Sequence, residues 1–411
     1  MSYDETVVDR AARSLQPRFA EIDRKTKDKL RRVLAAFRHH RVGDRHFASV
    51  SGYGHDDLGR ETLDRVVAQV FGAEAALVRL QFVSGTHAIA CALYGILRPG
   101  DELLSVVGAP YDTLEEAIGL RGTGCGSLAE WGISYRQIEL LPDGTPDWEA
   151  IATAIAPNTR VVTIQRSCGY SWRPSLAIDE IERLVKLVKA QNPDVVCFVD
   201  NCYGEFVEDC EPTAVGADLM AGSLIKNPGG TIAPAGGYIA GRADLVERAA
   251  CRLTAPGIGS AGGATFDLNR LLFQGFFLAP QMVAEAIKGT HLVAMVFAEL
   301  GYPVQPAPDA ERRDVIQAVK LGSPEKLEAL CTAIQHHSPI GSYLDPVPGE
   351  MPGYESQLVM AGGTFIDGST SEFSADGPLR EPYVAFCQGG AHWTQVAIAL
   401  EAAVEAFRHL D

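Results

Sequence analysis

Apolar and polar positions between residues 50 and 290 follow two alternating patterns. Short apolar runs rich in β-branched residues indicate buried strands, and apolar residues spaced three or four apart between these runs indicate helices. The predicted strands are 75–82, 102–107, 160–165, 195–200, 219–224 and 237–241, and the main predicted helices are 61–72, 86–97 and 177–191. Strands joined through helices are typical of a mostly parallel sheet covered on both faces. The pattern therefore predicts one large α/β domain.

The two ends of the chain differ from this central pattern. Residues 5–39 read as a charged amphipathic helix, whereas the chain beyond residue 290 changes to a smaller mixture of helices and strands. The predicted C-terminal elements are a connecting helix at 281–301, a helix at 323–337, strands near 357–363 and 383–388, and a closing helix at 392–407. We therefore predict an N-terminal helical arm at 1–48, the large domain at 49–290 and a small α+β domain at 291–411.

Composition and charge narrow the class of partner. The chain has 411 residues, a formal net charge of −16 and 46% hydrophobic residues. The negative charge argues against nucleic acid or an anionic membrane as the main partner. The first residues are charged and lack the apolar segment of a signal peptide, and the most apolar stretch, 271–287, is too short and too polar to span a bilayer. A small molecule is therefore the expected partner.

The cysteine and histidine patterns give no sign of a metal site. Nine cysteines are spread along the chain without a CxxC pair, and several of them lie in apolar runs. This distribution is typical of reduced, buried thiols in a cytoplasmic protein. The adjacent pairs His39–His40 and His336–His337 point to different faces of a helix, so neither pair grips one ion. We therefore expect no metal and a cytoplasmic location.

Three chemically distinctive segments follow predicted strands, at the carboxyl ends where parallel sheets bind ligands. In the first, 82-FVSGTHA-88, a strand ends, a turn follows and a helix begins. The hydroxyls of Ser84 and Thr86 and the free amides around Gly85 are suited to hold an anion such as a phosphate. An ordinary helix N-cap at Ser84 or Thr86 explains the same segment equally well.

The other two segments carry an acid and a base. Asp200 ends the apolar strand of 195-VVCFVDNCYGEF-206, and a buried carboxylate there needs a partner or a chemical role. Lys226 follows strand 219–224 within 218-DLMAGSLIKNPGGTIAPAGGYIAG-241, a run of small and apolar residues that predicts a pKa lowered by desolvation. The alternatives are an aspartate that caps a turn and a lysine whose amine reaches solvent.

One cofactor needs all three features together. Pyridoxal phosphate (PLP) requires an anchor for its phosphate, a lysine that forms a Schiff base, and an acid at the pyridinium nitrogen. The acid keeps that nitrogen protonated, so that the ring withdraws electrons from a substrate carbanion. The anion-binding turn at 84–86, Asp200 and Lys226 therefore predict a PLP enzyme. A nicotinamide-dependent dehydrogenase is disfavoured, because no strand–GxGxxG–helix unit occurs.

The motifs in this order resemble a known group of enzymes. SGTHA at 84–88, VDN with YGE at 199–205, and SLIKNPGG at 223–230 are similar to those of the fold-type I PLP enzymes. The resemblance is closer to the methionine gamma-lyase and cystathionine beta-lyase branch, in its aluminium resistance protein subfamily. Its most specific segments are 49–63, 165–176, 253–264 and 367–383. It extends from about residue 53 to the C-terminus and implies a large, mostly parallel seven-stranded sheet with a smaller α+β C-terminal domain.

The resemblance also implies roles for individual residues. Lys226 would form the Schiff base with the cofactor and then shuttle protons, while Asp200 would pair with the pyridinium nitrogen. The residues implied for the phosphate are Ser84, Gly85 and Thr86 with their backbone amides, and Ser223. Tyr111, in 108-GAPYDTLEE-116, would stack on the cofactor ring, with an ordinary core tyrosine as the alternative.

An arginine is expected to bind the substrate α-carboxylate, because a guanidinium group grips a carboxylate with two parallel bonds. Arg380, in 378-PLREPY-383, is the first candidate, and a surface ion pair is the alternative for this residue. Arg166 and Arg173 are further candidates for the same role.

Two positions depart from the pattern of the branch. Where the branch often has a hydroxyl before the lysine, this chain has Ile225, so one phosphate contact is missing or comes from elsewhere. The branch also uses a Tyr-x-Arg pair from a neighbouring subunit. Here Tyr53-Gly54-His55 lacks the arginine, and Arg60 is the candidate substitute. If this contact is kept, the active site is shared, which predicts a homo-oligomer, either a dimer or a tetramer.

The reaction implied by the resemblance is cleavage of a carbon–sulfur bond. A sulfur amino acid such as cystathionine, cysteine or methionine would lose its β- or γ-substituent as a thiol, leaving an α-keto acid and ammonia. An aminotransferase, a replacement enzyme and a decarboxylase share the Schiff base, and the sequence does not separate them. A non-catalytic PLP-fold protein involved in metal tolerance is a further alternative, which the intact Lys226 and Asp200 disfavour.

Overall fold

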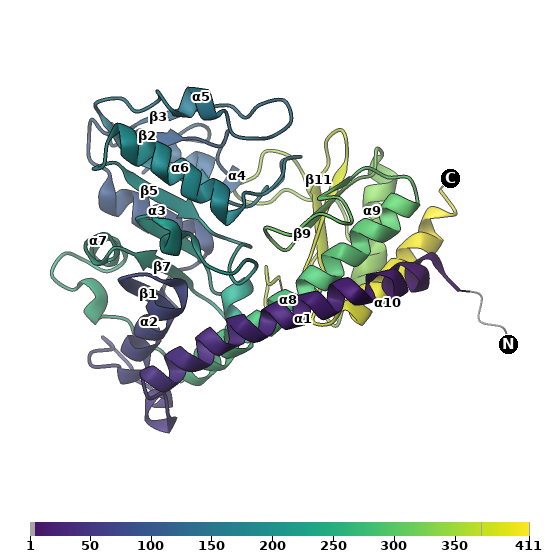
Figure 1. Ribbon diagram of the computed structural model, residues 1–411, viewed down its shortest axis with the longest axis horizontal. Coiled ribbons are helices and arrows are strands. Elements are labelled where there is room, and N and C mark those ends of the chain that lie inside the picture. Colours follow the sequence, from purple (N-terminus) through teal and green to yellow (C-terminus); the bar gives the residue numbers. More distant parts are fainter. Residues whose placement is uncertain (1–4, 371, 411) are drawn as a thin grey trace.

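A computed structural model describes residues 5–370 and 372–410 and shows a large and a small domain joined by long helices (Figure 1). The large domain contains a seven-stranded sheet, and the small domain contains a five-stranded sheet. Helices cover both faces of the larger sheet. This architecture confirms the predicted α/β class with a second, smaller α+β unit at the C-terminus.

The large sheet is mostly parallel. Its strands lie in the order β1-β7-β6-β5-β4-β2-β3, and only β7 runs antiparallel to its neighbours, β6 and β1. The strands are β1 Ala75–Arg79, β2 Glu102–Ser105, β3 Ser134–Gln137, β4 Thr159–Gln165, β5 Val196–Asp200, β6 Leu219–Ser223 and β7 Gly237–Gly241. The sequence pattern predicted all of these except β3. That edge strand reads SYRQ and has no apolar run that would reveal it.

Alternate side chains of the sheet enter two separate cores, because successive strand residues point to opposite faces. In β5, Val196 and Phe198 belong to one core, and Cys197 and Val199 belong to the other. The helices of this domain are α2 Leu58–Phe71, α3 Gly85–Ile96, α4 Asp112–Ile118, α5 Trp148–Ile151, α6 Ile178–Gln191 and α7 Ala243–Leu253. Helices α3, α4 and α7 cover the first core, whereas α2 and α6 cover the second.

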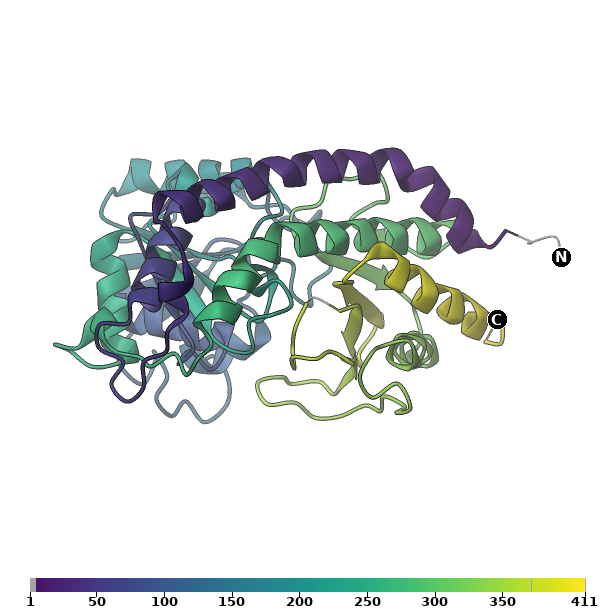
Figure 2. The ribbon, with the colours of Figure 1, turned by 90° about the horizontal axis from the view of Figure 1, so that it is seen from below.

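Two long helices connect the domains. Helix α1 Val7–His39 lies along α8 Asn269–Glu299 and runs antiparallel to it, and both helices extend over the large and the small domain (Figure 2). Helix α8 begins before the predicted connector at 281–301, because it continues through Pro280, a residue that usually marks a helix boundary. Among the described residues, no helix combines the length and the apolar character needed to cross a bilayer.

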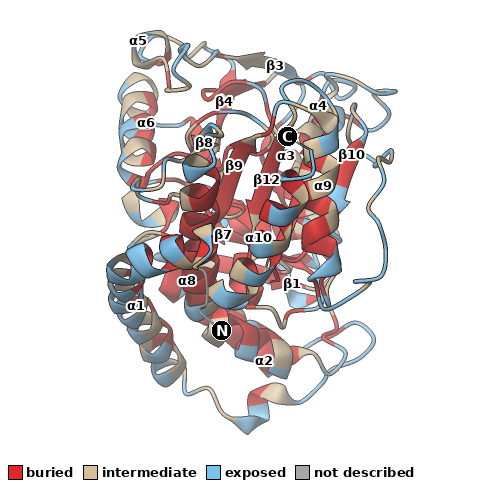
Figure 3. Ribbon diagram, turned by 90° about the vertical axis from the view of Figure 1, so that its right-hand side faces the viewer, coloured by how far each residue is buried: buried red, intermediate tan, exposed pale blue. Residues whose placement is uncertain are grey.

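The small domain has an antiparallel sheet in the order β10-β11-β12-β9-β8. Its elements are β8 Val304–Gln305, β9 Ile316–Lys320, α9 Pro324–His336, β10 Leu358–Ala361, β11 Ser374–Pro378, β12 Val384–Gln388 and α10 Trp393–Phe407. Helices α9 and α10 turn their buried sides inward (Figure 3). Strand β11 was not predicted, because its sequence, SADGP, contains glycine, proline and a carboxylate.

The turn after Lys226 packs directly on the backbone of α8. Residues Asn227–Gly229 form a short 3-10 helix, and Gly230 has a φ of 52°. A Cβ atom on Gly275 of α8 would collide with the carbonyl oxygen of Gly229, and a Cβ atom on Gly230 would collide with the carbonyl oxygen of Gly275. The glycines therefore allow an approach between turn and helix that no other residue permits.

Replacement of Gly275 by alanine is expected to lower the free energy of unfolding by about 1–3 kcal/mol, because the added methyl group must push the turn and the helix apart. Urea unfolding of wild type and variant measures this difference. Gly43→Ala is the matched control, since its Cβ would meet nothing closer than 4.0 Å. Equal stability of Gly275→Ala and the wild type would contradict the tight contact.

Candidate active site

A cavity of about 260 Å³ lies between the two domains, at the carboxyl ends of β4, β5 and β6. The large domain supplies the start of α3, the start of α4 and the segments that follow the three strands. The small domain supplies β11 and the end of β12. The predicted site residues that line this cavity are Ser84, Gly85, Thr86, Tyr111, Asp200, Ser223 and Lys226. The strand-end argument predicted that the turn at 84–86, Asp200 and Lys226 would meet, and they line one cavity together with Tyr111 and Ser223, which the resemblance supplied. The roles of all these residues remain predictions.

The start of α3 forms one wall with free hydrogen-bond donors. The Ser84 side chain caps the helix by accepting from the amide of His87 at 3.1 Å, as in the simpler alternative for this segment. Gly85 and Thr86 occupy the first turn, where backbone amides have no acceptor within the helix. Across from them, the buried Ser223 hydroxyl has no hydrogen-bond partner among the described residues. This combination suits a phosphate group.

Asp200 ends β5 with its carboxylate in the cavity. The carboxylate accepts a hydrogen bond from the amide of Cys202 at 3.1 Å. Burial raises the pKa of Asp200, while the nearby charge of Lys226 lowers it. A carboxylate in this position is stabilised by any ligand that brings an N–H group or a positive charge. That requirement matches the protonated ring nitrogen of PLP.

Lys226 behaves differently from the sequence-based prediction. Its amine lies 3.7 Å from the centre of the Tyr203 ring. Burial lowers the pKa of Lys226, as predicted, but the neighbouring Tyr203, Cys202 and Asp200 raise it, and the net shift is upward. The prediction of a net lowered pKa was wrong, because the apolar sequence around the lysine does not reveal the acidic groups that the fold places beside it.

Three tyrosines form another part of the cavity wall. The Tyr111 hydroxyl shares a hydrogen bond of 2.7 Å with the Tyr354 hydroxyl, and the two rings are nearly perpendicular. Tyr170 packs against both rings and donates to Asp376 at 2.9 Å. Sequence reasoning found only Tyr111. Tyr170 lies within the distinctive segment 165–176, whereas Tyr354 is in a loop that carries no motif.

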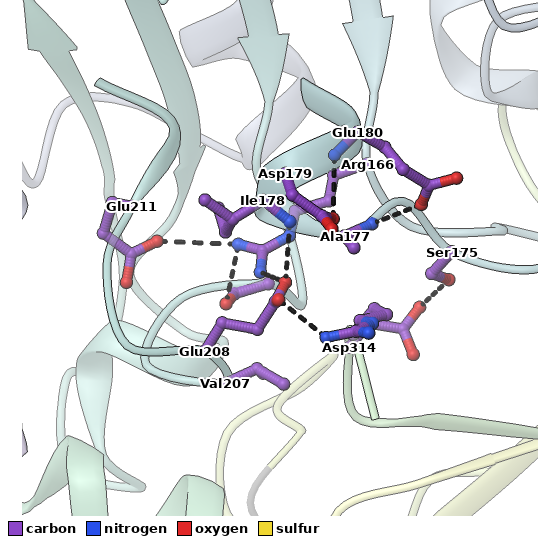
Figure 4. Close-up of polar contacts among 12 residues, drawn as sticks. Arg166, Ser175, Ala177, Ile178, Asp179, Glu180, Val207, Glu208, Glu211 and Asp314 are labelled. Carbon is purple, nitrogen blue, oxygen red and sulfur yellow. Dashed lines mark hydrogen bonds and ion pairs between the residues drawn. The ribbon is translucent and has the colours of Figure 1, made fainter. Parts of the chain in front are cut away.

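Arg166 does not line the cavity, and its two terminal nitrogens contact a group of buried polar residues (Figure 4). Its side chain is 0% exposed and donates to the Asn201 side chain, the Gly204 carbonyl and Glu208 at 2.8–2.9 Å. Glu211 lies 3.6 Å away. The guanidinium group therefore neutralises buried carboxylates, and its Nε atom, which has no partner among the described residues, is buried away from the cavity.

The other two predicted arginines also do not line the cavity. Arg173 is buried and donates to the carbonyls of Pro174, Gln165 and Ser167, so it shapes the loop that forms one cavity wall. Arg380 is exposed on the turn after β11, and its charge opposes the rise that burial causes in the pKa of Asp112. Because Asp112 follows Tyr111, Arg380 lies near the site, and its role toward a substrate stays a prediction.

Arg60 and Tyr53 lie in the region predicted to meet a neighbouring subunit. The Arg60 side chain is 1% exposed and donates to the carbonyls of Gly54, Gly263 and Ala261. It therefore fixes the loop of its own subunit, and it is not free to replace the missing arginine of the branch. Tyr53 is 84% exposed at the tip of that loop.

The family model for methionine gamma-lyase matches residues 4–408, nearly the whole chain. The chain belongs to the methionine gamma-lyase family. The predicted resemblance is thereby confirmed. The cofactor of this family is PLP, and the cavity fits it through the unpartnered Ser223 hydroxyl, the free amides of α3, the buried acid Asp200 and the amine of Lys226.

Three family relatives are similar over almost their full lengths. The uncharacterized protein YnbB of Bacillus subtilis is 52% identical over 376 residues, which cover 91% of this chain and 89% of the relative. A solved structure from Listeria monocytogenes, described as a candidate cystathionine beta-lyase involved in aluminium resistance, has a TM-score of 0.94 and 48% identity, covering 97% of this chain and 99% of its own. A carbon–sulfur lyase involved in aluminium resistance from Clostridium novyi has a TM-score of 0.93 and 45% identity, covering 98% and 95%.

Replacement of Arg166 by methionine is expected to lower the free energy of unfolding by about 3–5 kcal/mol, because Glu208 and Glu211 would lose a buried counter-charge. Urea unfolding measures the effect, with the exposed Arg380→Met as the control, for which we expect a change within about 0.5 kcal/mol. A stable Arg166→Met variant that has only a raised KM would instead support a substrate-binding role.

Proposed function

We propose that this protein is a PLP-dependent carbon–sulfur lyase that converts a sulfur amino acid into a thiol, an α-keto acid and ammonia. The observation that carries the proposal is the convergence of Lys226, Asp200 and the unpartnered Ser223 hydroxyl on one cavity. Membership of the methionine gamma-lyase family supports carbon–sulfur chemistry in particular.

Under this proposal, different residues of the chain hold the cofactor and transfer protons. When bound, PLP supplies an electron sink that stabilises negative charge at the substrate α-carbon. Lys226 would anchor it covalently, Ser223 and the α3 amides would hold its phosphate, and Asp200 would face its ring nitrogen. Once the substrate displaces the Lys226 amine, that amine is free to take the proton from the α-carbon.

The cavity also offers a donor for the departing sulfur. In an elimination, the electrons of the carbon–sulfur bond leave with sulfur, which then takes up one proton. Burial raises the pKa of Tyr111, so its hydroxyl stays protonated and remains a donor at neutral pH. The hydrogen bond to Tyr354 holds this hydroxyl in position. We propose that Tyr111 serves the leaving group as well as the cofactor ring.

Experiments can distinguish two other functions that the same cavity would allow. A transaminase, a replacement enzyme or a decarboxylase would use Lys226 and Asp200 in the same way and would differ in products. A non-catalytic PLP-fold protein in metal tolerance would bind amino acids without turnover. The described residues contain no cluster of three or more histidine, cysteine or acidic side chains arranged to hold a metal ion.

Purified wild-type protein supplied with PLP is expected to show a visible absorption band, and Lys226→Ala is expected to alter or lose it. Release of keto acid and thiol from a panel of sulfur amino acids should fall at least about a hundredfold in the variant, since the proton acceptor is removed. Lys186→Ala, on an exposed helix face, is the control for loss of one lysine.

A wild type that stays colourless with PLP would refute the cofactor role of Lys226. A coloured wild type that releases neither keto acid nor thiol from any sulfur amino acid would refute the lyase proposal and leave the alternative PLP reactions. Accumulation of the amine form of the cofactor with an amino donor would favour transamination.

We also propose that two subunits share the site, in a dimer or a tetramer. Exposed apolar side chains occur on the loop before α2, at the first residue of α2, on the loop that leads into α3 and on the loop before α8. They are Tyr53, Leu58, Val83, Ile258 and Phe266. The loops are joined by hydrogen bonds from Gly263 to Tyr53 and from Gln81 to Ala264. An apolar patch beside a ligand cavity is typical of a subunit interface.

Light scattering of the purified protein is therefore expected to give a mass of two or four times 44.1 kDa. Replacement of Tyr53 by aspartate should shift the protein toward monomer at low concentration, because the charge would be buried in the interface. The exposed Tyr343→Asp on the small domain is the control. A wild-type monomer at micromolar concentration would contradict the proposal of a shared site.

A further inference from the structure

Strand β11 presents two polar side chains to the cavity that the proposed chemistry does not use. Ser374 and Asp376 alternate along the strand, so they lie on the same face, and both line the cavity. The buried Ser374 hydroxyl has no hydrogen-bond partner among the described residues. The Oδ2 atom of Asp376 accepts from the Tyr170 hydroxyl at 2.9 Å, and no side chain of the described residues donates to Oδ1. The small-domain wall of the cavity therefore has free acceptor capacity.

The charge of Asp376 lies among groups that stay neutral, apart from Lys226. Burial raises the pKa of Asp376 to about 6, while the Tyr170 hydrogen bond and the charge of Lys226 oppose this rise, so the carboxyl group is mostly ionised at neutral pH. The other titratable groups that sense this charge are all buried, have raised pKa values and keep their protons. They are Tyr111, Tyr170, Tyr203, Tyr354, Cys331 and Cys387.

The proposed function needs a base that has not yet been assigned. A free amino acid carries an ammonium group at neutral pH, and this group must lose a proton before its nitrogen can displace Lys226 from the cofactor. The raised pKa of Tyr111 keeps that hydroxyl protonated, so it does not accept the proton. Asp200 would face the ring nitrogen, and the third carboxylate of the cavity, Asp367, is exposed. Asp376 is the enclosed carboxylate that remains.

We propose that Asp376 is the general base that receives the incoming α-amino group, with the Ser374 hydroxyl accepting a second hydrogen of the same group. This inference rests on the proposed function and adds a catalytic residue to it. One N–H bond of the substrate ammonium breaks and one O–H bond forms on Oδ1 of Asp376, which gives a neutral amine and a neutral carboxyl group. The nitrogen keeps the electron pair, which is then available to displace Lys226. Asp376 returns the proton to solvent before the next substrate enters.

The energy of this proton transfer is within reach of the site. An α-amino group has an ordinary pKa of about 8, and the pKa of Asp376 is raised to about 6. Enclosure in the cavity lowers the pKa of the ammonium group and favours the neutral carboxyl group, so the difference narrows as the substrate enters. The displacement of Lys226 then consumes the neutral amine, and a small equilibrium amount of it is enough.

The same carboxylate could instead serve only to hold Tyr170 in place. An amide oxygen also accepts a hydrogen bond, so Asp376→Asn preserves the contact with Tyr170 and removes the base. Tyr170→Phe keeps the base and removes a hydrogen bond that lowers the pKa of Asp376, so that pKa should rise. The two variants therefore change the pH dependence in different ways, which a purely structural carboxylate would not do.

The test follows the displacement of Lys226 in the holoenzyme by α-methylmethionine. This amino acid has an ammonium group but no hydrogen on the α-carbon, so removal of an α-proton cannot follow. The rate is read from the change in the visible cofactor band on rapid mixing at a series of pH values. For the wild type we expect the rate to rise as the pH increases through about 6 and then to level off, because Asp376 becomes ionised.

Asp376→Asn should lower this rate at pH 7 by about tenfold to a hundredfold, because only probe molecules that are already neutral can react. Its rate should continue to rise toward the pKa of the ammonium group, where the loss is recovered. In Tyr170→Phe the rise should begin at a higher pH than in the wild type. Ser374→Ala should raise the dissociation constant of the probe without moving the pH of the rise.

Matched controls isolate the cause of the change. Glu355→Gln removes an exposed carboxylate that does not line the cavity, and it should leave the rate within about twofold. The cofactor band of each variant is also titrated without the probe, so that titration of the linkage to Lys226 is separated from that of Asp376. Asp367→Asn examines the competing carboxylate, and a loss in this variant with none in Asp376→Asn would overturn the proposal.

The outcomes separate this inference from the proposed function. A rate in Asp376→Asn that equals the wild type, or that is lower by one factor at every pH, would overturn the role of Asp376 as the base. Release of thiol and keto acid from sulfur amino acids in the same experiment would still leave the lyase function standing. Displacement that depends on Asp376 as described, in a protein that releases neither product, would support the inference and refute the lyase function.

Discussion

The site depends on a single packing constraint, the close approach of the turn after β6 to the backbone of α8. Gly275 and Gly230 have no side chains at the contact, and the turn therefore lies directly against the helix. Lys226 is the residue that enters this turn, so its backbone is fixed from both sides. Because β5 and β6 are parallel neighbours, Asp200 ends at the same edge of the sheet, and the acid and the amine meet there.

The residues that we propose for the cofactor are placed by this geometry. The residues that would face a substrate come from the small domain and the loop that contains Tyr354. The strand ends and the start of α3, which we propose hold PLP, belong to the large sheet domain. Tyr354 lies in a loop and Asp376 in the small domain, so the wall that a substrate would meet is built from a separate unit. Under the proposed function, substitutions in that unit would change the substrate wall and leave the proposed cofactor contacts of the large domain in place.

This division also explains what the sequence could predict. Asp200 and Lys226 follow apolar strands, and a rule about parallel sheets was enough to bring them together. Asp376 was missed because β11 reads SADGP, which resembles a turn, and its strand conformation comes from pairing with β10 and β12. Arg166 was a further candidate for binding the substrate because a guanidinium group binds any carboxylate, and only the fold shows that its ionic partners are Glu208 and Glu211.

The segment from Asn201 to Glu211 lies beneath the cavity, and its contacts explain how several charged side chains can be buried there. Arg166 holds the segment from Asn201 to Glu211, and this segment contains Cys202, whose amide binds the carboxylate of Asp200. Burial raises the pKa of Glu205 to about 8, so this carboxyl group is mostly neutral at pH 7 while it accepts from Tyr238 at 2.7 Å. A neutral Glu205 adds no second negative charge beneath the cavity. Asp200 is thereby left as the acid that a cationic ring nitrogen would meet, and Arg166 influences the cavity only through the position of the segment that it holds.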